Sequence, residues 1–349
     1  MHAKTSGSSR KSAKAPKTST EAGPGGGRRS ETALDSAAAH LRDATLDVIW
    51  RQWAALGGSA ASRARAHAVV DPEALVLASL AFVSEEPRLA DVLHDWITRN
   101  ADLLSVQRAK NLTRDFDEPV RALIGDGLRW LARIAVEQGK DLRWRSLLKQ
   151  RLLSRSTWVA PAVRTNKSRA SRARVTDPAT LVLRLRLAFA VGLKADLLSY
   201  LFCAPEEWTT VRTLSATTGY TPAAVRRAGD DLAAAQFIES RAAQPTQYRI
   251  ARENWRPLLK FDEELPSWRG WRETYVFAAA FQAWHRIPAA DTRTPYVASV
   301  EGRELLERHW AVFERARIAA WGPHPRIQDS VAFMANAVNT LARWMRDSA

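Results

Sequence analysis

Residues 191–250 run VGLKADLLSYLFCAPEEWTTVRTLSATTGYTPAAVRRAGDDLAAAQFIESRAAQPTQYRI, and the order of their helix, turn and strand signals decides the fold that we expect. A first helix begins at Leu193, because apolar residues crowd one side of it, and Pro205 ends it. Thr210 is placed as the N-cap of a second helix over residues 211–217. This stretch therefore opens with two helices joined by a short extended segment.

A third helix has the strongest local signal in the chain. Thr221 is its expected N-cap, Pro222 occupies its first position, and Tyr220 can fold back onto Val225 as a hydrophobic staple. Helical spacing over residues 221–235 then divides the side chains into two groups. The inward positions are Val225, Ala228, Gly229 and Leu232, and the outward positions are Ala223, Ala224, Arg226, Arg227, Asp230 and Asp231.

Two strands follow the third helix. The runs 237–241 and 247–250 have β-type composition, and the five residues between them suit a hairpin loop. The order is helix, short strand, helix, turn, helix, hairpin. It resembles the winged helix-turn-helix domain of bacterial transcriptional regulators over about 60 to 70 residues, with a recognition helix at 221–235 and a wing at 237–250.

The resemblance implies that the third helix lies in a DNA major groove, with its N-terminal residues nearest the base edges. Position by position, it assigns Ala223, Ala224, Arg226 and Arg227 to base edges, Thr221 to positioning at the helix start, and Arg241 and Arg249 to the phosphate backbone. Arginine suits these places because its planar guanidinium bonds guanine or phosphate bidentately.

Three features depart from the pattern of that superfamily. Gly229 stands where a core aliphatic is usual, Gln236 stands where a helix-ending glycine is usual, and Asp230 with Asp231 would repel phosphate. An alternative therefore stays open, in which the same unit binds a protein partner, as an adaptor or antitoxin-like module does.

The net charge of +15 is concentrated outside this stretch. Residues 1–30 hold seven Lys and Arg against one Glu, and residues 155–177 hold six against one Asp, whereas residues 191–250 are neutral. Basic segments of this kind either solubilise a disordered extension or help to hold nucleic acid through its phosphates.

Composition limits the remaining possibilities. The chain has no run of 18 apolar residues and no apolar core near its N-terminus, so we expect neither a membrane span nor a secretory signal. Cys203 is the only cysteine, which excludes an intramolecular disulfide and fits a cytoplasmic protein. No glycine-rich phosphate loop and no metal-type histidine spacing is present, so no cofactor or metal is expected.

The flanking regions are predicted to be helical. We divide the chain into a disordered basic arm (1–30), a helical domain (31–154), a basic linker (155–176), the winged helix with its leading helix (177–260), and a tryptophan-rich helical domain (261–349). The six tryptophans of the last region suit a packed core, or, as an alternative, a ligand pocket.

Catalysis has one weak candidate. Arg303 and His309 form an Arg-x5-His pair that resembles the motif of HEPN ribonucleases, in which the histidine transfers protons. His309 also falls on the apolar side of its predicted helix, so a packed histidine is the stronger interpretation. The sequence as a whole predicts a mainly α, non-enzymatic DNA-binding regulator of transcription, acting as a homodimer on double-stranded DNA.

Overall fold

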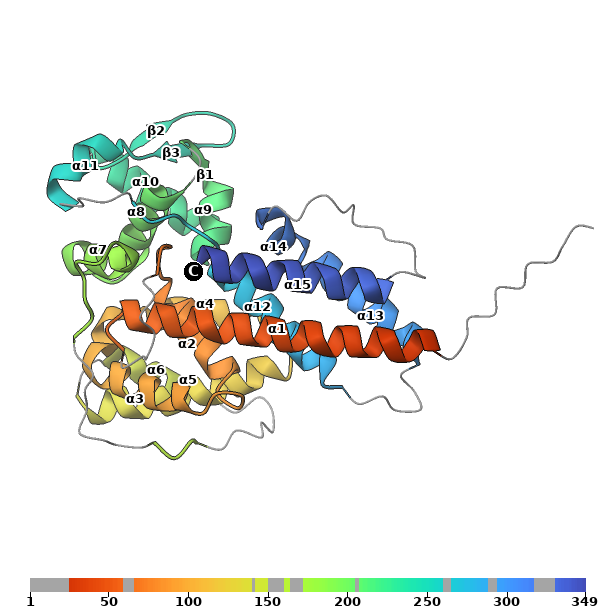
Figure 1. The fold of residues 1–349 in the computed structure, drawn as a ribbon. Coiled ribbons are helices and arrows are strands. Elements are labelled where there is room, and N and C mark those ends of the chain that lie inside the picture. Colours follow the sequence, from red (N-terminus) through yellow and green to blue (C-terminus); the bar gives the residue numbers. More distant parts are fainter. Residues whose placement is uncertain are drawn as a thin grey trace, which may run out of the picture.

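The computed structural model describes the backbone of residues 25–58, 66–139, 142–149, 160–163, 172–204, 207–259, 265–287, 294–316 and 330–349. Over these residues the chain is mainly helical, with one small three-stranded antiparallel sheet (Figure 1). The predicted fold class, mainly α with a small hairpin, is therefore confirmed. None of the described helices is long and apolar enough to cross a membrane.

Helices from both ends of the chain build what we call the helical body. Its bounds are α1 (Gly25–Ala55), α2 (Pro72–Ala81), α3 (Arg88–Asn100), α4 (Val106–Thr113), α5 (Val120–Glu137), α6 (Arg145–Leu148), α12 (Trp271–His285), α13 (Pro295–Arg308), α14 (Trp310–Arg315) and α15 (Ser330–Ser348). Two 3₁₀ turns, Ala101–Leu103 and Leu142–Trp144, connect parts of it.

The body has a single hydrophobic core. The long helices α1 and α15 lie side by side (Figure 1), and buried residues of both join one cluster with α2, α3, α5 and α12. The predicted helical domains at 31–154 and 261–349 therefore contribute to one core. The reason is physical: the apolar stripe of α1, with Leu41 and Val48 fully buried, is covered by Leu341 and its neighbours, which lie 300 residues further along the chain.

The middle of the chain forms a second unit, residues 177–259, which we call the hairpin unit. Its elements are a 3₁₀ turn (Pro178–Thr180), α7 (Leu181–Phe189), α8 (Leu193–Cys203), β1 (Thr209–Thr210), α9 (Val211–Thr218), α10 (Pro222–Ala234), β2 (Glu239–Arg241), β3 (Gln247–Arg249) and α11 (Arg252–Leu259). Most of its buried apolar residues make a second core cluster, which also includes Val69, whereas Ala179 and Leu183 join the core of the body.

The sheet of the hairpin unit has the strand order β1-β3-β2, with antiparallel neighbours. Tyr248 in the central strand pairs with Thr209 on one side and Ser240 on the other. Because side chains alternate along a strand, Thr209 and Tyr248 face the helices, while Gln247 and Arg249 face outward; Ser240 in the edge strand is exposed. Tyr248 is accordingly fully buried beneath α10.

The capping residues act as predicted. The Thr210 and Thr221 hydroxyls accept hydrogen bonds from the amides of Thr213 and Ala224, and Gly219 ends α9 in the left-handed conformation (φ 76°). Asp71 likewise caps α2. The order of elements from α8 to α11 is thus the order that the sequence predicts.

Three local predictions differ from the structure. Helix α1 begins at Gly25, so residues 25–30 of the predicted disordered arm are helical, and residues 1–24 lie outside the described residues. The strand expected to begin at 237 begins at 239. The amide of Phe237 still donates a hydrogen bond to the carbonyl of Leu232 at the end of α10, so the strand starts after it. Helix α4 was not predicted. Most of the basic linker, including Trp158, also lies outside the described residues.

Candidate nucleic-acid interface

The outward face of α10 is open to solvent. Ala223, Arg226 and Arg227 are exposed, as is the cap Thr221, whereas Ala224 is half-buried. The opposite face, with Val225 and its inward partners, packs on the core of the hairpin unit. Among the described residues, neither Arg226 nor Arg227 has a carboxylate partner in an ion pair. We call the surface formed by the exposed residues Arg226 and Arg227, together with Arg212 and Arg241, the arginine face.

The two aspartates that could repel phosphate are already engaged. Asp231 forms an ion pair with Lys194 of α8, with 2.8 Å between Nζ and Oδ2. Asp230 accepts a hydrogen bond from the hydroxyl of Tyr248, with 2.7 Å between the two oxygens. Lys194 offsets the charge of Asp231, and Tyr248 directs the carboxylate of Asp230 toward the sheet. The repulsion expected from the sequence is thereby reduced.

The structure explains why position 229 is a glycine. A Cβ atom at this position would lie 2.5 Å from the Tyr248 ring, which is closer than carbon atoms approach. The ring fills the space that a core aliphatic on α10 would occupy, so glycine and tyrosine form a complementary pair. The departure from the superfamily pattern therefore reflects a close helix–sheet contact.

Gln236 takes the conformation that a helix-ending glycine usually adopts. Its φ is 60°, and the next amide, that of Phe237, donates back to the carbonyl of Leu232 over 2.9 Å. This is the hydrogen bond that closes a helix through a left-handed residue. Gln236 has a Cβ atom and therefore adopts this left-handed conformation at a cost in free energy that glycine would avoid.

The two wing arginines differ from each other. Arg249 forms ion pairs with Glu239, at 2.6 Å, and with Glu207, so its charge is committed within the protein. Arg241 instead bonds the side-chain oxygen of Gln247 at 2.7 Å. Both guanidiniums lie over the ring of Trp208, at 4.8 and 4.6 Å from its centre. Of the two predicted backbone contacts, Arg241 keeps its positive charge available and Arg249 has most of its charge neutralised.

Arg212 belongs with the candidate site and was not predicted. It is exposed in the first turn of α9, just after the cap Thr210. Amides at a helix N-terminus favour an anion, and an arginine beside them adds to that preference. The sequence carried the signal, because a capping threonine two residues before an arginine marks a basic helix start.

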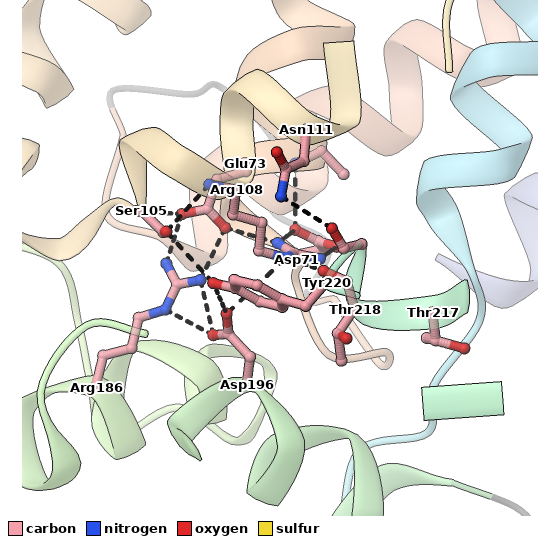
Figure 2. Close-up of polar contacts among 12 residues, drawn as sticks. Asp71, Glu73, Ser105, Arg108, Asn111, Arg186, Asp196, Thr217, Thr218 and Tyr220 are labelled. Atoms are coloured by element: carbon pink, nitrogen blue, oxygen red, sulfur yellow. Dashed lines mark hydrogen bonds and ion pairs between the residues drawn. The ribbon is translucent and has the colours of Figure 1, made fainter. Parts of the chain in front are cut away.

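Behind this surface, five charged side chains meet between the hairpin unit and the body (Figure 2). We call this cluster the charged joint. Arg108 of α4 contacts the carboxylates of Asp71 at 2.5 Å and Glu73 at 2.6 Å. Arg186 of α7 contacts Glu73 at 2.7 Å and Asp196 of α8 at 2.8 Å. All five side chains are at most 5% exposed.

The electrostatics of the joint rest on pairing. Burial alone would raise the pKa values of Asp71 and Glu73, but Arg108 and Arg186 more than offset it and hold both below their ordinary values. Burial prevails at Asp196 and raises its pKa. Three carboxylates face two guanidiniums here, so the joint needs further donors.

One of those donors comes from the turn before α10, and another is the amide of Ser105, which donates to Glu73 over 2.7 Å. Tyr220 donates its hydroxyl to Asp196 over 3.1 Å, and it packs against the core cluster that contains Val225, its expected staple partner. Arg108 also donates to the carbonyl of Thr218 over 2.8 Å, and Asn111 donates to that of Gly219 over 3.1 Å. The turn that precedes the third helix is therefore hydrogen-bonded to the body.

The remaining candidates are packed into the body. His309 lies beside Phe277, with 5.8 Å between ring centres, and burial lowers its pKa. Arg303 pairs with Glu307 in the same helix. Trp271 contacts both Tyr275 and Trp344, as expected for core residues. Among the described residues no group of three His, Cys, Asp or Glu side chains could hold a metal ion.

Comparisons of this chain with protein-family models, with curated proteins and with solved structures return no match.

Proposed function

We propose that this chain is a DNA-binding transcriptional regulator that uses the hairpin unit as a winged helix-turn-helix. Helix α10 would enter the major groove, with Arg226 and Arg227 reading base edges, and Arg241 on the wing would bond a phosphate. The observation that carries the proposal is the exposed face of α10, where two arginines have no ion-pair partner among the described residues and both aspartates are engaged elsewhere.

Two further parts of the proposal follow from DNA geometry. Arg212 would hold a phosphate at the start of α9, a role not assigned from the sequence. A homodimer would present two copies of α10 to neighbouring major grooves, which matches the two-fold symmetry of most operators. Such a protein would act in the cytoplasm, and it would need neither cofactor nor metal for binding.

The test is a binding titration of the full chain on its own upstream DNA and on a scrambled duplex, over a series of salt concentrations. The double variant Arg226→Ala with Arg227→Ala should lose the preference for the upstream duplex, at a cost of about 1 to 3 kcal/mol per base contact. A matched control replaces the exposed Arg133 of α5 and Arg343 of α15 by alanine. Equal binding by the parent and a folded double variant would reject the proposal.

A second function, contact with a protein partner, is favoured by one observation. Phe237 and Leu258 of the hairpin unit are 39% and 68% exposed, and Leu187 is 56% exposed. Large apolar side chains at a surface suit a protein interface. Salt separates the two functions, because phosphate contacts weaken steeply with ionic strength and apolar contacts do not.

A further inference from the structure

We infer that the DNA-binding surface continues from the hairpin unit onto helix α4 of the body, where Arg114 holds a second stretch of phosphate backbone. The inference rests on the proposed function. It concerns residues outside the hairpin unit, in a helix that the sequence did not predict. Its starting point is the attachment of the turn before α10 to α4.

Helix α4 has one polar stripe facing solvent. Gln107, Asn111 and Arg114 follow each other at helical spacing, and Gln107 donates to Asn111 over 3.0 Å. The opposite face, with Val106, Ala109 and Leu112, is buried in the body. The stripe is therefore a fixed row of polar groups.

This stripe adjoins the start of α10. Asn111, in its middle, donates to the carbonyl of Gly219, two residues before the cap Thr221. The side chain of Leu112 lies so near Gly219 that a Cβ there would be 2.5 Å from it. Because the N-terminal residues of a recognition helix lie deepest in the groove, the phosphates that border this end of α10 would pass over α4.

The charge on the stripe is positive and available. Arg114 is exposed, and the three carboxylates that follow it in sequence have other partners, with Glu118 paired to Arg121. Asp115 pairs with Arg272 at 3.4 Å, and Asp117 pairs with Arg308 at 2.9 Å. Among the described residues Arg114 has no ion-pair partner, so its guanidinium complements a phosphate.

The charged joint gives this surface its geometry. Arg108 belongs to the buried side of the same helix and bonds both the body carboxylates and Thr218 of the turn. One helix thus fixes the orientation of α10 on one side and presents Arg114 on the other. DNA bound to α10 would meet α4 at a set position.

The experiment measures the affinity of the full chain for the upstream and scrambled duplexes against salt concentration. Arg114→Ala should weaken binding to both duplexes by the same factor, because a phosphate contact carries no sequence information. The slope of log affinity against log salt should fall in magnitude by about 0.9, the value for one phosphate contact. Arg133→Ala, on an exposed face of α5, is the matched control and should change neither quantity.

A variant that should strengthen DNA binding serves as a control, because misfolding of Arg114→Ala could also weaken binding. Gln107→Lys adds a charge on the same stripe and should raise the affinity for both duplexes, with a slope steeper by about 0.9. Both variants should unfold at the same urea concentration as the parent, since both positions are exposed. These opposite changes would be hard to produce by misfolding.

The outcomes separate this inference from the proposed function. If Arg226→Ala with Arg227→Ala abolishes the preference for upstream DNA while Arg114→Ala and Gln107→Lys bind like the parent, the extension onto α4 is wrong and the proposed function stands. If none of these variants changes binding, both fail. An effect of Arg114→Ala on the upstream duplex alone would also overturn the phosphate contact.

Discussion

The charged joint and the arginine face use the same residue types in opposite ways. In the joint, Arg108 and Arg186 are at most 3% exposed, and Arg108 contacts three carboxylates while Arg186 contacts two. On the arginine face, Arg226 and Arg227 are exposed and no described carboxylate pairs with them. The arginines of the joint are paired within the protein and hold two units of the chain together. Those of the arginine face are available to a ligand. Burial and pairing, rather than residue identity, separate the structural arginines from the candidate functional ones.

The difference also sets what each arginine does for stability. A buried ion pair repays the cost of removing two charges from water only while every partner is present, so its loss leaves an uncompensated charge. Removal of an exposed arginine that has no ion-pair partner leaves no uncompensated buried charge, because solvent takes its place. Loss of a joint arginine should therefore lower the free energy of unfolding, whereas loss of an arginine from the face should affect binding.

Removal of one joint arginine tests this contrast most strongly. Arg186→Ala leaves Glu73 and Asp196 buried without one of their two guanidiniums, and the free energy of unfolding should fall by about 3 to 5 kcal/mol. Arg227→Ala is the matched variant and should change it by about 0.5 kcal/mol or less. Urea denaturation of both variants measures the difference. Equal losses would mean that burial does not separate the two sets.

The pH dependence of the joint sharpens the comparison. The pKa values of Asp71 and Glu73 lie below their ordinary values near 4, so the stability they contribute is present above that pH and is lost as the pH falls. Each unit of lowering contributes about 1.4 kcal/mol. Asp196 acts in the opposite sense, because its pKa is raised and its cost at neutral pH is relieved by acid.

Arg186→Ala should raise the pKa values of Glu73 and Asp196 relative to the parent, because each then keeps only Arg108 as a guanidinium partner. Without the guanidinium, burial raises the pKa values of Glu73 and Asp196, and protonation relieves the buried charge. The gap in unfolding free energy between parent and variant should therefore narrow from pH 7 to pH 4. Urea midpoints at three pH values measure it, and a gap that widens on acidification would contradict the pairing that we describe.

The local elements of the hairpin unit were predictable because their signals are local. Thr210, Gly219, Thr221 and Pro222 act within a few residues of themselves, and the helices start and stop where these residues predict. The joint was not predictable, since its members come from positions 71 to 196 and each looks like an ordinary helix residue. Asp71 shows the limit: its role as an N-cap could be predicted, and its ion pair with Arg108 could not.

The shared core of the body was not predictable for the same reason. The stripes on α1 and α15 each indicate a buried face, but neither says which helix covers it, so the shared core of the body was missed. Helix α4 is short, and its apolar residues are too few to stand out by periodicity. Arg226 and Arg227 of the arginine face could be predicted, and Arg212 was not. The different ion pairing of Arg241 and Arg249 depends on which carboxylates the fold brings near them.

A smaller effect is expected from the helix–sheet contact under the arginine face. Gly229→Leu restores the residue type that the winged-helix pattern predicts, yet its side chain would collide with the Tyr248 ring. We expect a loss of about 1 to 3 kcal/mol in unfolding free energy, as for an overpacked core. Adding Tyr248→Ala should recover part of it by making room. A stabilised single variant would show that the ring does not occupy that space.

The smallest effect is expected at Gln236, and it should be favourable. The residue holds a left-handed φ of 60°, which costs a residue with a Cβ about 1 to 2 kcal/mol, whereas glycine adopts it freely. Glycine loses more backbone entropy on folding, so Gln236→Gly should gain about 0.5 to 1 kcal/mol in total. Ala234→Gly, two residues earlier and still helical, should lose about 1 kcal/mol. The urea midpoints should move in opposite directions for the two glycine variants, with DNA affinity unchanged in both. That result would place the strain in the backbone at Gln236 and leave binding to the first turns of α10. A loss of stability in both variants would remove the argument for a strained helix end.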